Sequence, residues 1–394
     1  MLRALLSALL ASALAFQPSP AADDAWSRVA ALYRQRLQQA GIVGSSLMFV
    51  KDGRVLHKAF EGFQDRDTRR SVDEETIFHW ASITKTFTGI AIMQLRDRGR
   101  LSLDDPIVKY VPELRQAHNP YGDMSQVTIR HLMSHSGGFR SGTWPWGGDQ
   151  PWHPFEPTRW AQVVAMFPYT ELLFKPGTQY RYSNPGVIFL GRIIEELSGD
   201  DYEVYIAKNI FMPLGMSRSF FDRAPYHLAA HRSHSYAGTD EGVKEQRFDF
   251  DSGITVSNGG LNAPLGDMAK WLAFLIGGPG AAGEKDVLKR ASVEEMFTPR
   301  IRASDGEGGS GDDVQAGLSC FIERHRGVEL VGHSGDQNGF ISHLYIHRPS
   351  ASGYIVSFNT DMTSKRDPKR TTRAVDDELR ETMITELFQP GGRR

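Results

Sequence analysis

Cysteine is almost absent from this chain, which has 394 residues and a single cysteine, Cys320. The chain can therefore form no disulfide within itself, has no cysteine-rich metal site, and offers no cysteine near its amino terminus for a lipid anchor. Its stability has to come from a packed core. Because 40% of the residues are hydrophobic, there is enough apolar surface for one large domain or two moderate ones.

An excess of charge of either sign is absent as well. The 45 basic and 47 acidic residues give a formal net charge of −2, and the two signs are interspersed. This balance gives no indication of binding to nucleic acid or to a charged membrane surface. Beyond the amino-terminal segment, no hydrophobic run approaches the length of a transmembrane helix, so we expect no transmembrane anchor.

The amino-terminal segment has the pattern of a secretory signal peptide. A basic residue near the start precedes an apolar run at residues 4–16, which is too short to span a bilayer comfortably. Small residues suited to cleavage occur at residues 19–21, with residues 13–15 as an alternative. We expect residues 1–22 to be removed, and residues 23–394 to form a soluble protein that is secreted or periplasmic.

Strand patterns occur at both ends of the chain. Apolar runs at residues 42–50 and 54–60 flank Lys51-Asp52-Gly53, which predicts an antiparallel hairpin with an Asp-Gly turn. Further strands are expected after a stretch rich in Gly and Asp (304–313), at residues 317–323, 328–332, 341–346 and 353–359.

The middle of the chain is predicted to be mostly helical. Expected helices run from near residue 82 to near residue 99, over 128–135 with Thr128 as its cap, and over 158–167, 184–197, 202–210, 265–276 and 372–388. Between them, residues 139–157 contain Trp144, Trp146 and Trp152. This long loop is either held down by its own aromatic side chains or forms a lip beside a substrate.

Strands at both ends with helices between them predict the fold class. We expect an α/β fold of the α+β sandwich type, in which an antiparallel sheet formed from both chain ends is flanked by helices and carries an inserted all-helical lobe. The α/β part would cover about residues 25–80 and 300–394, and the helical part about residues 81–300, within one domain.

Ser82 and Lys85 are the strongest candidates for catalytic residues. Residues three apart on a helix share one face, so Lys85 can reach the Ser82 hydroxyl and take its proton if the lysine is neutral. Burial and the positive end of a helix beginning near Ser82 would both lower the lysine pKa. The Ser82 N–H could then be half of an oxyanion hole. Taken alone, the pair is equally compatible with a chance pair on a solvated helix.

Two further strings contain candidate site residues. Tyr182 and Asn184 are two residues apart before a predicted helix, so their side chains could share one cleft. The phenol could then transfer protons, and the amide could orient a substrate carbonyl. The alternative is that the Asn caps the helix and the Tyr simply packs beside it. Later, Gly332-His333-Ser334-Gly335-Asp336 follows a predicted strand, and the Asp336 N–H is a candidate for the second oxyanion donor. A simple turn between strands would also explain that string.

Two other site types fit the sequence less well. The strings around Ser136 and Ser334 each fail at one end to match the Gly-x-Ser-x-Gly pattern of α/β-hydrolases. His131 and His135 are four apart, as zinc ligands on a helix can be, but residue 132 is Leu where a metalloprotease has Glu. We therefore expect packing or capping roles for these histidines, and no metal or cofactor.

The order of the three strings, Ser-x-x-Lys, Tyr-x-Asn and His-Ser-Gly, resembles that of the penicillin-recognising serine hydrolases. The branch is the one with class C β-lactamases, D-alanyl-D-alanine carboxypeptidases, D-aminopeptidases and related carboxylesterases. The resemblance covers most of the chain, including the hairpin and residues 99–106, 129–138 and 259–261. It implies that Ser82 attacks a carbonyl while Lys85 and Tyr182 transfer protons. It also implies that water hydrolyses the acyl-enzyme, and that the substrate is bound by Asn184 and by His333-Ser334-Gly335-Asp336.

The third string departs from the β-lactamase pattern. Class C enzymes have Lys-Thr-Gly where this chain has His333-Ser334-Gly335, which resembles the peptidase and esterase relatives instead. An Asp336 carboxylate facing the cleft would also repel a substrate carboxylate. The expected function is an ester or amide hydrolase of the carboxylesterase or D-amino-acid peptidase type, acting on a small molecule or short peptide. The alternatives are a class C-like β-lactamase and a non-catalytic ligand-binding protein of the same fold.

Overall fold

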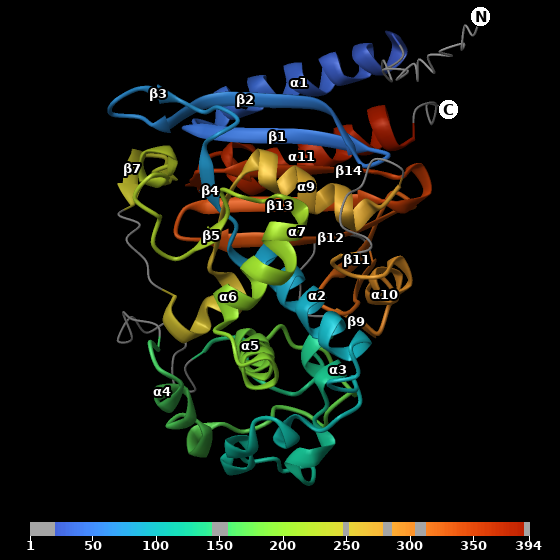
Figure 1. The fold of residues 1–394 in the computed structure, drawn as a ribbon. Coiled ribbons are helices and arrows are strands. Elements are labelled where there is room, and N and C mark those ends of the chain that lie inside the picture. Colours follow the sequence, from blue (N-terminus) through green and yellow to red (C-terminus); the bar gives the residue numbers. More distant parts are fainter. Residues whose placement is uncertain (1–19, 144–156, 247–251, 279–285, 304–312, 390–394) are drawn as a thin grey trace, which may run out of the picture.

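Strands from the two ends of the chain form one large antiparallel sheet in the computed structural model, which describes residues 20–143, 157–246, 252–278, 286–303 and 313–389 (Figure 1). The strand order is β3-β2-β1-β14-β13-β12-β11-β10-β9. The strands are β1 (Gly44–Lys51), β2 (Arg54–Asp65), β3 (Arg70–Ser71), β9 (Ile301–Arg302), β10 (Asp313–Ala316), β11 (Phe321–His325), β12 (Val328–Gln337), β13 (Phe340–His347) and β14 (Ser352–Phe358). The predicted fold class is confirmed, whereas the limits given for its two parts stay a prediction.

Some of the sequence predictions concern residues that lie outside the described ranges. The expected signal peptide, the loop containing three tryptophans and the stretch rich in Gly and Asp lie wholly or mostly in residues 1–19, 144–156 and 304–312, outside the described residues.

β1 and β2 form the hairpin that the sequence predicts. Lys51 pairs with Arg54, which leaves only Asp52 and Gly53 in the turn, with φ angles of 50° and 73°. Positive φ at both central residues is typical of a type I′ turn, whose twist matches that of the flanking strands. The Asp-Gly pair therefore fixes the register of the hairpin locally.

The late strands differ from the prediction in two places. β12 does not end at Gly332 but continues to Gln337, because β13 pairs with it along this whole length. The prediction that residues 317–320 begin a strand was wrong. Gly317 donates a hydrogen bond to the Cys320 carbonyl (2.9 Å), and Ser319 between them has a φ of 58°, so this segment is a turn that joins β10 to β11.

Helices cover both faces of the large sheet. α1 (Pro20–Ala40) and α11 (Thr372–Met383) pack together on one face, where Val29 and Leu379 belong to one buried apolar cluster (Figure 1). α9 (Leu265–Ile276) lies on the opposite face, against β1 and β14. The central strands are thus covered on both sides, which explains why every residue of β14 is buried.

α2 (Thr84–Asp97) runs through the middle of the helical region and contacts α5 (Asn184–Ser198) and α8 (Val256–Gly259). Its residues from Thr84 to Leu95 are all buried, as expected for a helix surrounded by other elements. The remaining α-helices of the described ranges are α3 (Ile129–Met133), α4 (Trp160–Val164), α6 (Tyr202–Ile206), α7 (Met212–Leu214) and α10 (Arg290–Met296). None of the described helices is both long and apolar enough to cross a membrane.

The predicted helices are present, several of them shortened. Those over 184–197 and 265–276 are confirmed almost to the residue. Those over 202–210 and 372–388 are also confirmed, each as an α-helix continued by a π-helical turn (Ala207–Phe211 and Ile384–Phe388), while those over 128–135 and 158–167 are shorter in the structure. Besides β3, β9 and β10 of the large sheet, six short strands were not predicted. They form two small sheets, β4-β8-β5 and β15-β6-β7, with β4 (Ile77–His79), β5 (Phe220–Phe221), β6 (Ser235–Thr239), β7 (Gly242–Gln246), β8 (Leu261–Pro264) and β15 (Thr360–Met362).

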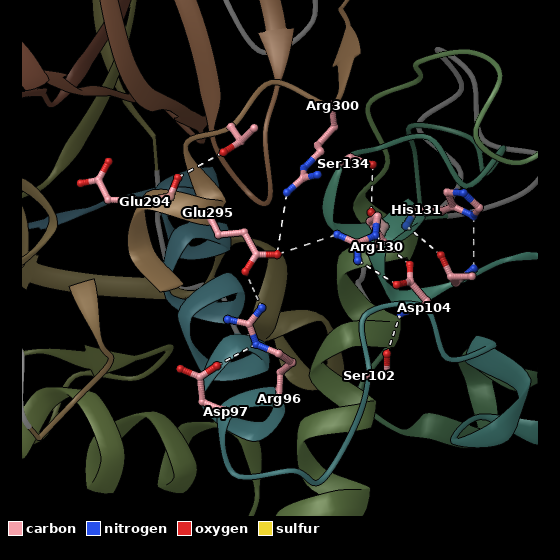
Figure 2. Close-up of polar contacts among 12 residues, drawn as sticks. Arg96, Asp97, Ser102, Asp104, Arg130, His131, Ser134, Glu294, Glu295 and Arg300 are labelled. Atoms are coloured by element: carbon pink, nitrogen blue, oxygen red, sulfur yellow. Dashed lines mark hydrogen bonds and ion pairs between the residues drawn. The ribbon is translucent and has the colours of Figure 1, made fainter. Parts of the chain in front are cut away.

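A network of ion pairs joins the helices at one side of this region (Figure 2). Arg130 of α3 donates two hydrogen bonds to Asp104, at 2.8 and 2.9 Å, and also lies 4.0 Å from Glu295 of α10. Glu295 in turn accepts a hydrogen bond of 2.6 Å from Arg96 of α2. Single exposed pairs contribute little to stability, but this network fixes α3 relative to α2 and α10.

Candidate active site

Ser82 lies in a tight turn between β4 (Ile77–His79) and α2. A short 3-10 turn covers Ala81–Ile83, and the α-helix begins at Thr84. The 3-10 turn and the α-helix follow one another without a break, so a helix begins near Ser82 as the sequence predicts. Ser82 is partly exposed, whereas its neighbours on both sides are buried.

The backbone around Ser82 is held in an uncommon conformation. Ala81 has a φ of 46°, a left-handed conformation that costs of the order of 1–2 kcal/mol for a residue with a Cβ atom. The Trp80 N–H donates to the Leu261 carbonyl (2.8 Å), and the Thr84 hydroxyl donates to the Ala81 carbonyl (2.6 Å). Within the described part of the chain, the Ser82 N–H has no hydrogen-bond partner. An N–H without a partner beside a candidate nucleophile is available to bind an oxyanion.

Lys85 lies directly beside the Ser82 hydroxyl. Its Nζ is 2.9 Å from Ser82 Oγ and 2.7 Å from the carbonyl oxygen of Asn258 in α8. The side chain is fully buried, and this loss of solvation lowers the lysine pKa well below its usual value. A neutral amine can donate one N–H to Asn258 and turn its lone pair to Ser82 Oγ, which is the arrangement that a general base requires.

Tyr182 covers the other side of Lys85. The Lys85 Nζ is 5.0 Å from the centre of the Tyr182 ring, which also lies 6.3 Å from the His333 ring. The Tyr182 ring packs closest to the imidazole of His135, at 4.5 Å between ring centres. The structure thus brings Tyr182 and His333 beside the pair of Ser82 and Lys85, although these segments are far apart in the sequence.

Asn184 is the first residue of α5 and not its cap. The cap is Ser183, whose hydroxyl accepts a hydrogen bond from the Gly186 N–H (3.1 Å). The Asn184 N–H donates to the Ser141 carbonyl (3.1 Å), while its Oδ1 is buried with no hydrogen-bond partner among the described residues. A buried amide oxygen without a partner is costly, so this side chain has bonding capacity to offer to a ligand.

His333 is buried on β12 in a defined tautomer. Its Nδ1 donates to the Ser334 carbonyl (2.6 Å), which leaves Nε2 as an acceptor, and Nε2 has no partner within the described ranges. Burial, with a smaller contribution from the nearby Lys85, lowers the His333 pKa to about 3. The imidazole is therefore neutral and differs from the charged lysine of the Lys-Thr-Gly string.

Gly335 and Asp336 face opposite sides of the sheet. A Cβ atom on Gly335 would lie 2.3 Å from the Trp80 carbonyl oxygen, so the bare glycine backbone packs against the turn that contains Ser82. Side chains alternate along a strand, and the Asp336 carboxylate accordingly lies on the α11 face, where it pairs with Arg373. Ser334 lies on that same face. Ser334 and Asp336 can therefore reach a substrate at Ser82 only through their backbone groups.

The end of β12 has a free edge beside Ser82. β11 pairs with β12 only as far as Gly332, so residues 333–337 are paired with β13 on one side and contact the Ala81–Ile83 turn on the other. Backbone groups at such an edge can pair with an extended substrate or bind an oxyanion.

Three contributions to the site could not be found in the sequence. The carbonyl of Asn258 has no side-chain signal at all. His79 is buried between Asn262 and Gln337, with its ring nitrogens 3.2 and 3.0 Å from their side-chain oxygens, and so links β4, β8 and the end of β12. His135 was expected to have a packing or capping role, and it does pack, but nothing in the sequence indicated that its partner would be Tyr182.

The histidines at positions 131 and 135 do not converge on a common point. His131 Nδ1 accepts a hydrogen bond from the Thr128 N–H (3.3 Å) and so completes the cap of α3. Across the described residues, no group of three or more His, Cys, Asp or Glu side chains could hold a metal ion.

Comparison with known proteins agrees with this geometry. Residues 29–378 match the Beta-lactamase family. The chain belongs to this family. A penicillin-binding protein homologue from Pyrococcus abyssi, described as octameric, has a similar structure with a TM-score of 0.73 and 30% identity, covering 92% of this chain and 79% of that one.

Curated relatives include an esterase. Esterase EstB of Burkholderia gladioli is 28% identical over 327 residues, which cover 79% of this chain and 74% of EstB. Protein flp of Staphylococcus aureus is 25% identical over 371 residues, 93% of this chain and 70% of flp. D-amino acid amidase from Ochrobactrum anthropi SV3 is 20% identical with a TM-score of 0.72, covering 91% of this chain and 99% of the amidase, and shows likeness of fold alone. The relatives of this chain in sequence thus include an esterase, and an amidase shares its fold.

Proposed function

We propose that this protein is a serine hydrolase that cleaves an ester or amide through an acyl-enzyme on Ser82. The observation that carries the proposal is the 2.9 Å contact between Ser82 Oγ and the buried Lys85 Nζ, whose pKa is lowered by loss of solvation. A serine hydroxyl needs a neighbouring base, and a lysine can act as one only when it is neutral.

The reaction begins with transfer of the Ser82 hydroxyl proton to Lys85 Nζ while Oγ bonds to the substrate carbonyl carbon. The negative charge that develops on the carbonyl oxygen is bound by the N–H groups of Ser82 and Asp336, the second of which lies at the free edge of β12. As the bond to the leaving group breaks, the proton passes from Lys85 through Tyr182 to that group. Water then attacks the acyl carbon and gives its proton to Tyr182 and Lys85, which return a proton to Ser82 Oγ as the bond between Oγ and the acyl carbon breaks.

Asn184 and His333 act on the substrate and not on Ser82. The unpartnered Asn184 amide would bind the acyl side of the substrate, and the His333 Nε2 would accept a hydrogen bond from it. A neutral His333 provides no charge for a substrate carboxylate, and this favours esters and D-amino-acid amides or short peptides over penicillins. EstB supports the ester side of this proposal. A class C-like β-lactamase is the second candidate, supported by the match to the Beta-lactamase family.

The test is to measure acylation and turnover with matched substrates. Wild type and the Ser82→Ala variant are incubated separately with p-nitrophenyl butyrate, D-alanine p-nitroanilide and a fluorescent penicillin, and intact mass is recorded together with product release. Turnover of the ester or anilide that disappears in Ser82→Ala supports the proposal. Rapid Ser82-dependent opening of the penicillin supports the β-lactamase instead. If no probe reacts in a Ser82-dependent way, the protein is a non-catalytic binder and the proposal is refuted.

We also propose that the protein is exported, on the strength of its basic and apolar amino-terminal pattern. Expression of the full chain in a Gram-negative host, followed by mass spectrometry of the periplasmic fraction, tests this. A periplasmic protein shortened by about 22 residues is expected. A full-length protein confined to the cytoplasm would contradict it.

A further inference from the structure

His135 lies at the end of α3 in a conformation that few residues tolerate. Its φ of 54° is left-handed, and its side chain is buried. Such a conformation costs free energy in a residue with a side chain and persists where the surroundings require it. The surroundings of His135 include the rings of Tyr180 and Phe321 and the three residues 181–183, among them Tyr182.

His135 contacts this segment on both sides of Tyr182. Its carbonyl oxygen accepts a hydrogen bond from the Arg181 N–H (2.8 Å), and its Nδ1 accepts one from the Ser183 N–H (3.2 Å). Between these two bonds, the imidazole packs against the Tyr182 ring, with 4.5 Å between ring centres. One residue therefore fixes the backbone before and after Tyr182 and also supports its ring.

The hydrogen bond to Nδ1 requires a neutral imidazole. Burial lowers the His135 pKa well below its usual value, and the neighbouring Lys85 and His333 lower it further. A protonated ring would place an N–H against the Ser183 N–H. Burial, above all, thus keeps the imidazole neutral and Nδ1 available as an acceptor.

The position of His135 is itself fixed from the other side. Ser134 donates from its hydroxyl to the Arg130 carbonyl (2.9 Å), and Arg130 is held by Asp104 and Glu295 in the network of Figure 2. His135 therefore extends from a helix that is anchored outside the active site.

We propose that His135 is a positioning residue, which sets Tyr182 against Lys85 and sets the start of α5, with Asn184, through Ser183. This inference rests on the proposed serine hydrolase function. It assigns His135 no contact with substrate and no proton transfer.

Two substitutions of His135 distinguish the role of its hydrogen-bond acceptor, Nδ1, from the role of its ring. Both replacement residues tolerate a left-handed backbone. His135→Gly removes the ring and Nδ1, while His135→Asn removes the ring but offers its side-chain oxygen near the position of Nδ1. We expect His135→Gly to lower kcat roughly 10- to 100-fold with little change in KM, as misplacement of a catalytic group does. His135→Asn should recover most of this loss.

A double-mutant cycle with Tyr182→Phe shows whether the effect acts through Tyr182. In the Tyr182→Phe background, His135→Gly should cost far less activity than in wild type, because the two residues act as one unit. Equal losses in both backgrounds would overturn the inference, as would unchanged kcat in His135→Gly. Should His135→Gly fail to fold, a loss of about 100-fold in a His135→Asn variant with an unchanged melting temperature would equally overturn it.

The failure of this inference is distinguishable from failure of the proposed function. Wild type and Ser82→Ala are measured in the same assays. If they do not differ, the proposed function is wrong. If Ser82→Ala is inactive while both His135 variants equal wild type, only the positioning role is wrong.

Discussion

Replacing Lys85 with Met should change how the stability of the protein depends on pH. The Lys85 pKa is lowered in the folded state by burial, whereas in the unfolded chain it has its usual value of about 10.5. At a pH between the folded-state and unfolded-state pKa values of Lys85, the unfolded protein binds one proton more than the folded protein. The free energy of unfolding of wild type therefore falls as the pH is lowered through this window, by about 1.4 kcal/mol per pH unit, and then levels off below the folded pKa.

Lys85→Met has no proton to gain at this position, so its stability lacks this dependence. From about pH 9.5 down to about pH 7.5, wild type should therefore lose stability relative to the variant, with a slope that approaches about 1.4 kcal/mol per pH unit where Lys85 is neutral only in the folded state. Urea unfolding at several pH values measures this difference, with Lys175→Met, at an exposed position, as the control for loss of one lysine. The same variant should lose roughly 10²- to 10⁴-fold in kcat, because it lacks the general base.

The refuting result is a constant stability difference between wild type and Lys85→Met over this pH range. It would mean that Lys85 keeps its proton in the folded protein, and a protonated lysine cannot take the Ser82 proton. A slope that Lys175→Met reproduces would equally refute the argument, since it would come from overall charge and not from burial.

Three other substitutions test the packing of the site and of the sheet. Gly335→Ala would place its Cβ 2.3 Å from the Trp80 carbonyl, so we expect a loss of about 1–3 kcal/mol in thermal unfolding together with lower activity; wild-type values for both would contradict the close approach. Asn359→Ala removes the acceptor of the Gly44 N–H bond (2.7 Å) in the buried sheet, and should cost about 1–3 kcal/mol in urea unfolding; wild-type stability would contradict the contribution of this bond. Asn184→Leu should raise KM several-fold at unchanged stability, and an unchanged KM would exclude its contact with substrate.

Local signals predicted much of the secondary structure. The Asp-Gly pair fixed the β1–β2 turn, Thr128 is the cap of α3, and the apolar period located α9 to the residue. The limits of β12 were less accessible, because the Gly- and Ser-containing string after Val331 has weak strand propensity by itself. Pairing with β13 determines that it is a strand, and that pairing is a contact between separate segments.

The sequence by itself determined that Ser82 and Lys85 can meet, because residues three apart are neighbours on any helical turn. It did not determine that Lys85 is neutral, because the pKa depends on burial by elements more than a hundred residues away. Nor did it determine that the Asp336 side chain faces Arg373, or that His135 holds both neighbours of Tyr182. Spacing along the chain fixes local geometry, whereas solvation, strand facing and contacts between distant segments exist only once the chain is folded.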